Sequence, residues 1–395
     1  MRRGTLALFL LLVAVDPSSA QPATPSSLRA TGPARCPTLV EAPAEIQKDP
    51  PGFDRIIRYL TLVERYCRNA DEALNEVDEF PWTDFKDSRG YLALHRDRLV
   101  KSSTSPTSVF GSVDWYVRVV QTASMLHLDR ALQGQPGSET HASHLNWSRE
   151  LVRLLEGVEG ESTFRHDWYV AIGALLHGEV AFRDLDAHLR EARGAFPESA
   201  RVALAWGMMR EAQASRRILP LLLAHNMARV FATERPDPER WLEDAERSYS
   251  RALNLDPDLH EARLRHGQVL VALGRPDAGY ADLLAVRDAT SEDRRFGYLA
   301  SLFAGAVLER NDRVPEAVES YRAAAELYPE CQIASFALSH ALRKAGNRDE
   351  AARLVQMALE RGTNKSCLDP VWIYDLGSGP QSFELIDGLR RRVRR

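Results

Sequence analysis

A spacing of 34 residues recurs from position 173 onward in this 395-residue sequence. Small residues mark it, for example Gly173 and Gly207, or Ala317 and Ala351. The same spacing separates Ala245 from Gly279, Ala252 from Val286, and Ala324 from Ala358. Self-similarity at a fixed period of this length is typical of a solenoid, in which each unit buries its apolar face against the next. Small residues recur where two helices approach so closely that a larger side chain would push them apart.

Helical periodicity extends upstream of these repeats. The segment 53–67 has apolar residues at positions 53, 56, 57, 60 and 63, which is the spacing of one helix face. We expect further helices near 112–132 and 142–157. Clusters of Gly, Pro and Ser at 87–90, 102–106 and 134–138 are expected to separate the helical stretches. Because alternating β-branched runs are scarce, the sequence predicts an all-α fold with negligible sheet.

The repeats also share a pattern of residue types. Residues 298–331 place small, large, small, aromatic, small and proline residues at Gly305, Leu308, Ala317, Tyr321, Ala324 and Pro329. This pattern resembles the tetratricopeptide repeat, and similar matches occur in 166–199, 245–286 and 332–365. In the last of these, Thr363 stands where proline is expected, as in a terminal repeat. The resemblance implies a right-handed α-solenoid of antiparallel helix pairs, whose first helices line a concave groove.

The resemblance divides the chain into parts. Residues 51–160 form a divergent helical region without the repeat pattern, and 161–365 form the solenoid. Gly267 and Gly305 are 38 residues apart, so we expect a longer turn near 288–295. An irregular helix is expected near 216–236, where the small-residue marks are missing. The sequence leaves open whether that helix is the second of one pair or the first of the next.

The pattern changes again in residues 366–395. A turn rich in proline and aromatic residues, around Asp369, Pro370, Trp372 and Tyr374, precedes a short amphipathic helix that ends in the run 390–395. The last repeat of a solenoid exposes an apolar face, so we expect this tail to cap it. The terminal arginines are expected to be a solvated end.

The first 20 residues predict export. Arg2 and Arg3 precede an unbroken apolar run over 6–15, and small residues at 18–20 offer a cleavage site. The run is half of the ~20 residues that a membrane-spanning helix needs. We therefore expect a cleaved signal peptide, a flexible leader over 21–50 and a periplasmic or extracellular mature chain. Only 5 of the 51 basic residues are lysine, a bias that is typical of a GC-rich bacterial genome.

Charge and cysteine content narrow the classes of partner and site. A net charge of −4 provides no positive field for nucleic acid, and no stretch of the mature chain is apolar enough to span a membrane.

Four cysteines in an exported chain predict disulfides. Cys331 and Cys367 flank the last antiparallel pair, which brings its two ends together. We therefore predict a Cys331–Cys367 bond and, by elimination, a Cys36–Cys67 bond.

No local motif predicts catalysis, a cofactor or a metal. His141 and His144 lie three residues apart, but no third ligand accompanies them. The run Gly377-Ser378-Gly379 lacks the pattern of a nucleophile elbow or a phosphate-binding loop. The chain is therefore not expected to be an enzyme.

The resemblance favours a scaffold that binds a protein or peptide partner in its groove, for example in assembly of the cell envelope. The resemblance carries fifteen residues over to the groove: Val170, His177, Leu204, Met208, Glu211, Leu264, Gln268, Val271, Leu302, Glu309, Arg310, Phe336, His340, Arg343 and Lys344. The alternative is an enzyme, or a binder of a saccharide or other small molecule, with its site in the divergent region. Stacking faces for such a ligand would come from Trp82, Trp115, Trp147, Trp168 and Trp372, unless these residues pack in the core.

Overall fold

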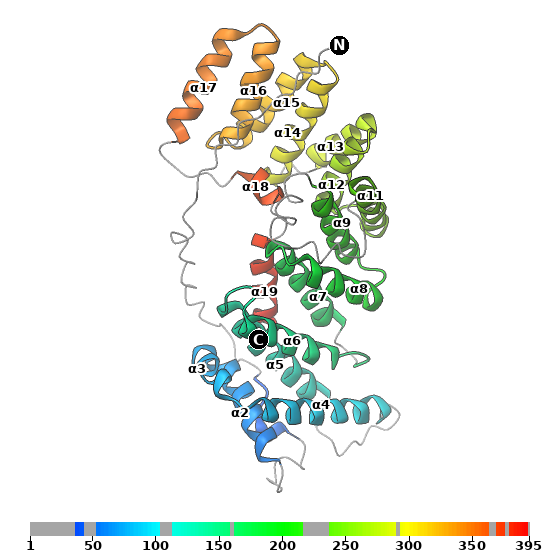
Figure 1. The fold of residues 1–395 in the computed structure, drawn as a ribbon, viewed down its shortest axis with the longest axis vertical. Helices are drawn as coiled ribbons and strands as arrows, with labels where there is room; N and C mark the ends of the chain where they lie inside the picture. The colour runs from blue at the N-terminus through cyan, green and yellow to red at the C-terminus, as the bar shows by residue number, and fades with distance from the viewer. Residues whose placement is uncertain are drawn as a thin grey trace.

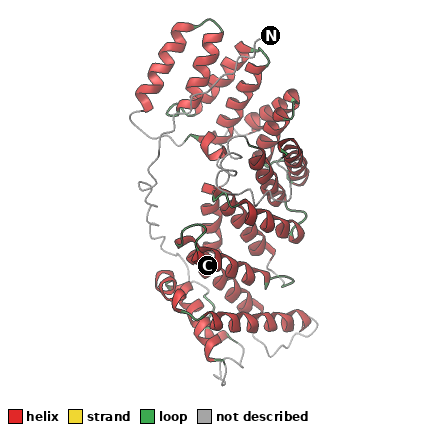
Figure 2. Ribbon diagram, in the orientation of Figure 1, coloured by secondary structure: helices red, strands yellow, loops and turns green. Residues whose placement is uncertain are grey.

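A computed structural model describes residues 36–42, 53–102, 113–158, 162–215, 237–289, 293–362, 369–375 and 379–393. Over these ranges the protein is all-α, with seventeen α-helices and no strand (Figures 1 and 2). The N-terminal region contains η1 (Leu39–Glu41), α2 (Asp54–Arg68), α3 (Ala70–Glu76), η2 (Val77–Glu79), α4 (Trp82–Ser102), α5 (Val113–Gln133) and α6 (Glu139–Arg153). None of the described helices is long and apolar enough to cross a bilayer.

The remaining helices pack as sequential antiparallel pairs, followed by two helices of the tail. The first helices of the pairs are α7 (Ser162–Gly178), α9 (Ala200–Ala214), α12 (His260–Ala272), α14 (Arg294–Arg310) and α16 (Gln332–Lys344). Their partners are α8 (Phe182–Ala195), α11 (Pro238–Leu255), α13 (Pro276–Ala289), α15 (Val314–Leu327) and α17 (Arg348–Gly362). The tail forms α18 (Pro370–Asp375) and α19 (Gly379–Val393). The pairs stack along the long axis of the molecule in chain order (Figure 1), so the predicted TPR-like solenoid is confirmed.

Glycine permits close approach within the pairs, as the 34-residue period predicts. A Cβ added at Gly305 would lie 2.6 Å from the ring of Tyr321. A Cβ added at Gly207 would lie 2.4 Å from the ring of Tyr249. No real side chain fits at such distances, so the tyrosine of the second helix packs directly on the glycine backbone of the first.

The pairing of α9 with α11 shows how the repeats continue across the stretch 216–236, where the 34-residue period fails. Gly207 lies on α9 and its packing partner Tyr249 on α11. The two helices therefore form one repeat, and the intervening stretch is an insertion between its members. The irregular helix expected near 216–236 lies outside the described residues. Asp237, which precedes Pro238 at the first position of α11, caps that helix by accepting a hydrogen bond from the Arg240 amide at 3.1 Å.

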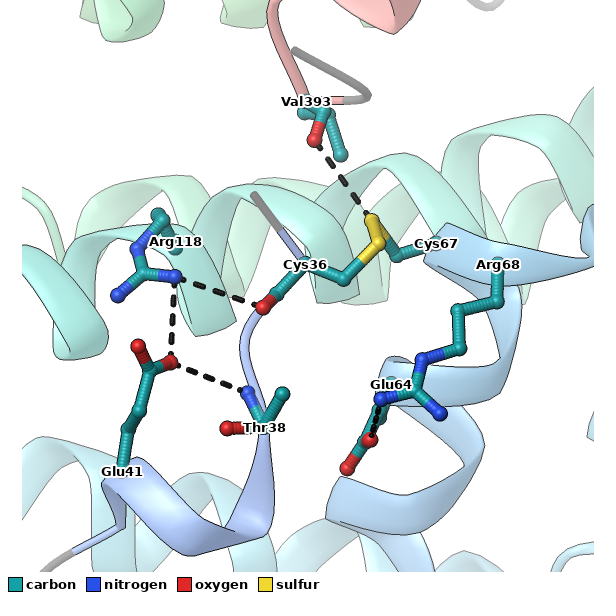
Figure 3. The surroundings of a disulfide bond; sticks show 8 residues. All are labelled: Cys36, Thr38, Glu41, Glu64, Cys67, Arg68, Arg118 and Val393. Carbon is teal, nitrogen blue, oxygen red and sulfur yellow. Dashed lines mark hydrogen bonds and ion pairs between the residues drawn. A yellow bond between two sulfur atoms is a disulfide. The ribbon is translucent and has the colours of Figure 1, made fainter. Parts of the chain in front are cut away.

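A disulfide anchors the N-terminal segment. Cys36 and Cys67 are bonded, with Cα atoms 5.7 Å apart, as predicted (Figure 3). Beside them, Arg118 of α5 forms an ion pair with Glu41 at 3.2 Å and donates to the Cys36 carbonyl at 3.4 Å. Cys331 is buried at the start of α16. Cys367 lies outside the described residues, so its bond to Cys331 stays a prediction.

Two expectations for the N- and C-terminal regions differ from the structure. Helix α4 runs without interruption through 87–90, where a break was expected. Buried Ser88 donates its hydroxyl to the Asp84 carbonyl at 2.7 Å, which satisfies the hydroxyl inside the helix, and no atom lies within 4 Å of a Cβ added at Gly90. At the other end of the chain, α19 does not cap the last repeat but packs against α7 and α5, far from α17 (Figure 1).

Candidate partner-binding face

The first helices of the pairs, α7, α9, α12, α14 and α16, contact one another in sequence. We call the surface that they form the A-helix face. In the region from α14 to α7, this face is covered by the C-terminal segment of the same chain, through α18 and α19 (Figure 1).

Tyr374 of α18 makes the main contacts with three first helices. Its hydroxyl donates to Glu211 of α9 at 2.7 Å. Its backbone carbonyl accepts from Arg265 of α12 at 3.3 Å, and the Arg265 guanidinium lies 4.3 Å from the centre of its ring. The ring also meets Phe303 of α14 edge-on, with centroids 5.0 Å apart. One tail residue therefore joins three repeats.

Arg265 is 4% exposed and is held by two carboxylates. It contacts Glu211 at 3.1 Å and Glu261 at 3.2 Å. Burial disfavours the charged guanidinium, but the two carboxylates outweigh that cost and hold the pKa of Arg265 above its usual value. A cation that is buried and paired in this way fixes the position of the tail.

Asp369, at the start of α18, is bound from two sides. The Tyr298 hydroxyl of α14 donates to its two carboxylate oxygens, at 3.0 and 2.9 Å. The backbone amide of Val371 donates to the same carboxylate at 3.0 Å, as at a capped helix start. Burial, and then the charge of Asp369, raise the pKa of Tyr298. The phenol therefore remains a donor at neutral pH.

Helix α19 belongs to the core of the molecule. Ile386 and Leu389 are buried among residues of the N-terminal helices. Arg390 forms an ion pair with the buried Asp129 of α5 at 2.8 Å, and Arg392 contacts Asp167 of α7 at 2.6 Å. The expectation of a solvated arginine end is therefore wrong for Arg390, whereas Arg392 is exposed and still makes its ion pair. The Val393 carbonyl lies 3.8 Å from the Cys67 sulfur, beside the disulfide (Figure 3).

The candidate groove residues occupy different environments in the structure. Six of them are buried, so they are not open groove positions: Val170, His177, Leu204, Met208, Leu264 and Leu302. Leu264 lines a residual cavity of about 10 Å³ beneath α18. Gln268, Glu309 and His340 are half-buried, whereas Arg310, Phe336, Arg343 and Lys344 are exposed. The exposed side chains belong to α14 and α16, beyond the tail. Partner binding by these exposed side chains stays a prediction.

Glu309 connects α14, α15 and α16. It accepts a hydrogen bond from the Tyr321 hydroxyl at 3.1 Å. It also lies 3.1 Å from His340 Nε2 and 3.0 Å from Lys344 Nζ. Because Glu309 already offsets the charge of Lys344, the positive charge at this end of the A-helix face is concentrated at Arg343 and Arg310.

Of the residues that hold the tail, the predicted groove included Glu211 but neither Arg265 nor Tyr374. Glu211 follows Gly207 by four residues, and Glu309 follows Gly305 by four; each receives the hydroxyl of the tyrosine that packs on the glycine. This shared spacing of Gly and Glu is visible in the sequence and marks both carboxylates. Arg265 carries no such mark, because its role depends on the position of Tyr374.

The structure shows where the histidines considered for a metal site and the tryptophans considered for a saccharide site lie. Within the described ranges, no group of three or more His, Cys, Asp and Glu residues is arranged to hold a metal ion. His141 contacts the Ala131 carbonyl at 3.0 Å, whereas His144 contacts His127 at 2.8 Å, so the two rings serve different partners. Trp115 and Trp168 are buried core residues, and Trp82 and Trp372 are exposed.

No known sequence family and no curated protein matches this chain. Solved structures do. The structural likeness is to tetratricopeptide repeat proteins, over about half of the chain. The protein MamA aligns with 18% identity and a TM-score of 0.37, over 53% of this chain and 98% of its own. PilF of Pseudomonas aeruginosa aligns with 15% identity and a TM-score of 0.39, over 57% and 88%. YrrB, described as a TPR protein with an unusual peptide-binding site, aligns with 15% identity and a TM-score of 0.35, over 52% and 90%. At these identities the likeness concerns the fold alone.

Proposed function

We propose that this protein is a helical-repeat scaffold that binds a protein or peptide partner on the A-helix face formed by α14 and α16. One observation supports the proposal most directly: the neighbouring part of the same face already holds a polypeptide segment, the tail. Tyr374 of that segment contacts a carboxylate, a guanidinium and an aromatic ring, those of Glu211, Arg265 and Phe303. Aromatic residues and arginine dominate the binding energy of most protein interfaces.

The exposed side chains of α16 define the chemistry of the partner. Phe336 is 38% exposed, and His340 and Arg343 follow it at spacings of four and three residues, so all three share one face of the helix. Phe336 offers an apolar anchor, and Arg343 and Arg310 offer guanidinium groups. A partner that presents an apolar side chain next to a carboxylate fits this arrangement.

The proposed setting is the cell envelope or the exterior of a bacterium. The signal-like sequence over 1–20 and the Cys36–Cys67 disulfide support export, because disulfides persist in oxidising compartments. Assembly of an envelope complex is the role in which an exported scaffold of this kind would act.

The experiment is affinity purification of the full-length protein from the native envelope, with three baits in parallel. The wild type should retain a specific partner, and Phe336→Ala should weaken its binding by about 2 kcal/mol. The matched control is Leu359→Ala, which truncates an exposed apolar residue on the second helix of the same repeat. If Leu359→Ala loses the partner and Phe336→Ala keeps it, the proposed face is wrong.

Charge reversal tests the polar part of the same face. Replacing both Arg343 and Lys344 by glutamate should slow association with the captured partner and change its salt dependence, because exposed charges act mainly on the association rate. Stopped-flow or biosensor kinetics at two salt concentrations measure this effect. An unchanged association rate would remove these residues from the interface.

A further inference from the structure

A cavity of about 300 Å³ lies in the N-terminal region, outside the repeats. Its walls come from five elements, α2, η2, α4, α5 and α6. Cavities of this size, lined by aromatic side chains with a few convergent polar groups, are typical of small-molecule sites. The helices around the cavity lack the repeat pattern, so the cavity is not a feature of the solenoid.

One wall of the cavity is aromatic and reaches the surface. Trp82 is 52% exposed and stacks on Trp147, with ring centroids 5.5 Å apart and planes 21° from parallel. Phe85 packs edge-on against Trp147, with ring centroids 3.8 Å apart. The Trp82 indole therefore contacts the rings of Trp147 and His144, while about half of its surface remains in contact with solvent. A large apolar side chain in this position provides a stacking platform.

A buried chain of hydrogen bonds adjoins these rings, because His144 lies 5.8 Å from Trp82 and His127 lies 4.7 Å from Phe85 between ring centroids. The Tyr59 hydroxyl lies 3.1 Å from His127 Nε2, and the Nδ1 atoms of His127 and His144 lie 2.8 Å apart. His144 Nε2 lies 3.3 Å from the Asp78 carboxylate, which Arg130 also binds at 2.9 Å. If His144 donates to Asp78, then His127 donates to His144 and Tyr59 donates to His127, which pairs every ring nitrogen with both imidazoles neutral. Burial and the neighbouring His144 lower the pKa of His127, consistent with this neutral state.

Hydroxyl and carboxylate groups of α6 also line the cavity. Glu139, Thr140 and Ser143 come from the first turns of α6 and face the same cavity. Glu139 is exposed, and Thr140 and Ser143 are half-buried. The Thr140 and Ser143 hydroxyls can both donate and accept hydrogen bonds, whereas the carboxylates of Glu139 and Asp78 accept them.

The charges favour a neutral ligand over a cation. One of the two carboxylates that line the cavity, Asp78, is already paired with Arg130 and His144. Bringing an ammonium group to it would place a second cation beside the Arg130 guanidinium. A ring with an apolar face and several hydroxyl groups uses the aromatic and the polar groups without that repulsion, because its C–H face stacks on an indole and its hydroxyls meet carboxylate and hydroxyl side chains.

We propose that this cavity binds a sugar ring of a neutral saccharide, stacked on Trp82 and hydrogen-bonded by Asp78 and Glu139. The site is separate from the A-helix face, so the saccharide and the protein partner would bind at different places on one scaffold.

Calorimetric titration of the full-length protein tests the proposal. The probes are neutral hexasaccharides built from glucose, from galactose and from N-acetylglucosamine, with choline as the cationic comparison. At least one saccharide should bind at millimolar concentration or below, and Trp82→Ala should weaken its binding about tenfold. The control variant is Trp372→Ala, which removes a tryptophan of similar exposure from α18 and should bind as the wild type does.

A second pair of variants separates this site from the proposed scaffold face. Glu139→Gln keeps the shape of the side chain and should weaken saccharide binding severalfold, whereas Phe336→Ala should leave it unchanged. Circular dichroism checks the fold of each variant. The proposal is overturned if no hexasaccharide binds, if choline binds instead in a Trp82-dependent manner, or if Trp82→Ala and Trp372→Ala bind a saccharide equally.

Discussion

Tyr374 donates a hydrogen bond of 2.7 Å to Glu211, although 163 residues separate them in the sequence. The same carboxylate receives the Tyr249 hydroxyl at 2.6 Å and the Arg265 guanidinium at 3.1 Å. Three helices and the tail therefore meet at one side chain. The tail is part of the folded solenoid, and it divides the A-helix face into a covered part and an open part.

Removing the Tyr374 hydroxyl should destabilise the protein. Tyr374→Phe keeps the ring on Arg265 and Phe303 but deletes the donor to a charged acceptor, which should cost about 1.5–3 kcal/mol. Urea denaturation measures the free energy of unfolding. Trp372→Phe, an exposed aromatic change on the same helix, is the control and should have little effect. Equal stabilities of the two variants would mean that the Glu211 contact does not hold the tail.

The ion pair between Arg390 and Asp129 should be costly to break from one side. Asp129 is only 6% exposed, so Arg390→Ala leaves a buried carboxylate without its cation, although the Tyr66 hydroxyl still donates to it at 2.6 Å. We expect a loss of about 3–5 kcal/mol in urea denaturation. Arg391→Ala changes an exposed neighbour on the same helix and should lose much less. A similar small loss in both would place the arginine run in solvent after all.

Two glycine substitutions should change stability in opposite directions. Gly207→Ala places a methyl group 2.4 Å from the Tyr249 ring and should destabilise the α9 and α11 pair by about 1–3 kcal/mol. Gly194→Ala on α8 meets no atom within 4 Å and should stabilise the helix by about 0.5–1 kcal/mol. Thermal unfolding of both variants compares the signs. If Gly207→Ala also stabilises the protein, the Tyr249 ring does not pack directly on Gly207.

Acid should destabilise the solenoid through His188. This histidine is 1% exposed, and burial lowers its pKa from 6.5 to about 4, although its Nε2 atom donates to the Tyr169 carbonyl at 2.8 Å. Between those values the unfolded chain binds a proton that the folded chain does not, so stability present above pH 6.5 is lost as the pH falls toward 4. Wild type should lose about 2–3 kcal/mol more than His188→Gln over this window. Urea titrations at several pH values measure the difference; parallel curves would contradict the burial effect.

The repeats were predictable because they depend on local composition and period. Gly305 and Tyr321 are 16 residues apart, and that spacing alone predicts that they pack together within one helix pair. The corresponding residues Gly207 and Tyr249 are 42 apart. An insertion between the two helices hid their relationship, since the period fails although the contact is kept.

The docking of the tail was not predictable for a different reason. Nothing near Asp369 or Tyr374 in sequence indicates that Tyr298, Glu211 and Arg265 will receive them, because these contacts arise only when distant repeats are assembled. For the same reason Leu264 and Leu302 were assigned to an open groove. Helical periodicity gives the face of a helix, but it does not say whether that face meets solvent, a neighbouring helix or the tail.

Hydrogen exchange on the full-length protein, with and without its purified partner, tests the central claim most directly. The partner should protect amides of α14 and α16, around Phe336 and Arg343, while α15 and α17 on the second helices exchange as before. Protection confined to α15 and α17, or to the N-terminal helices α2–α6, would contradict binding on the open part of the A-helix face.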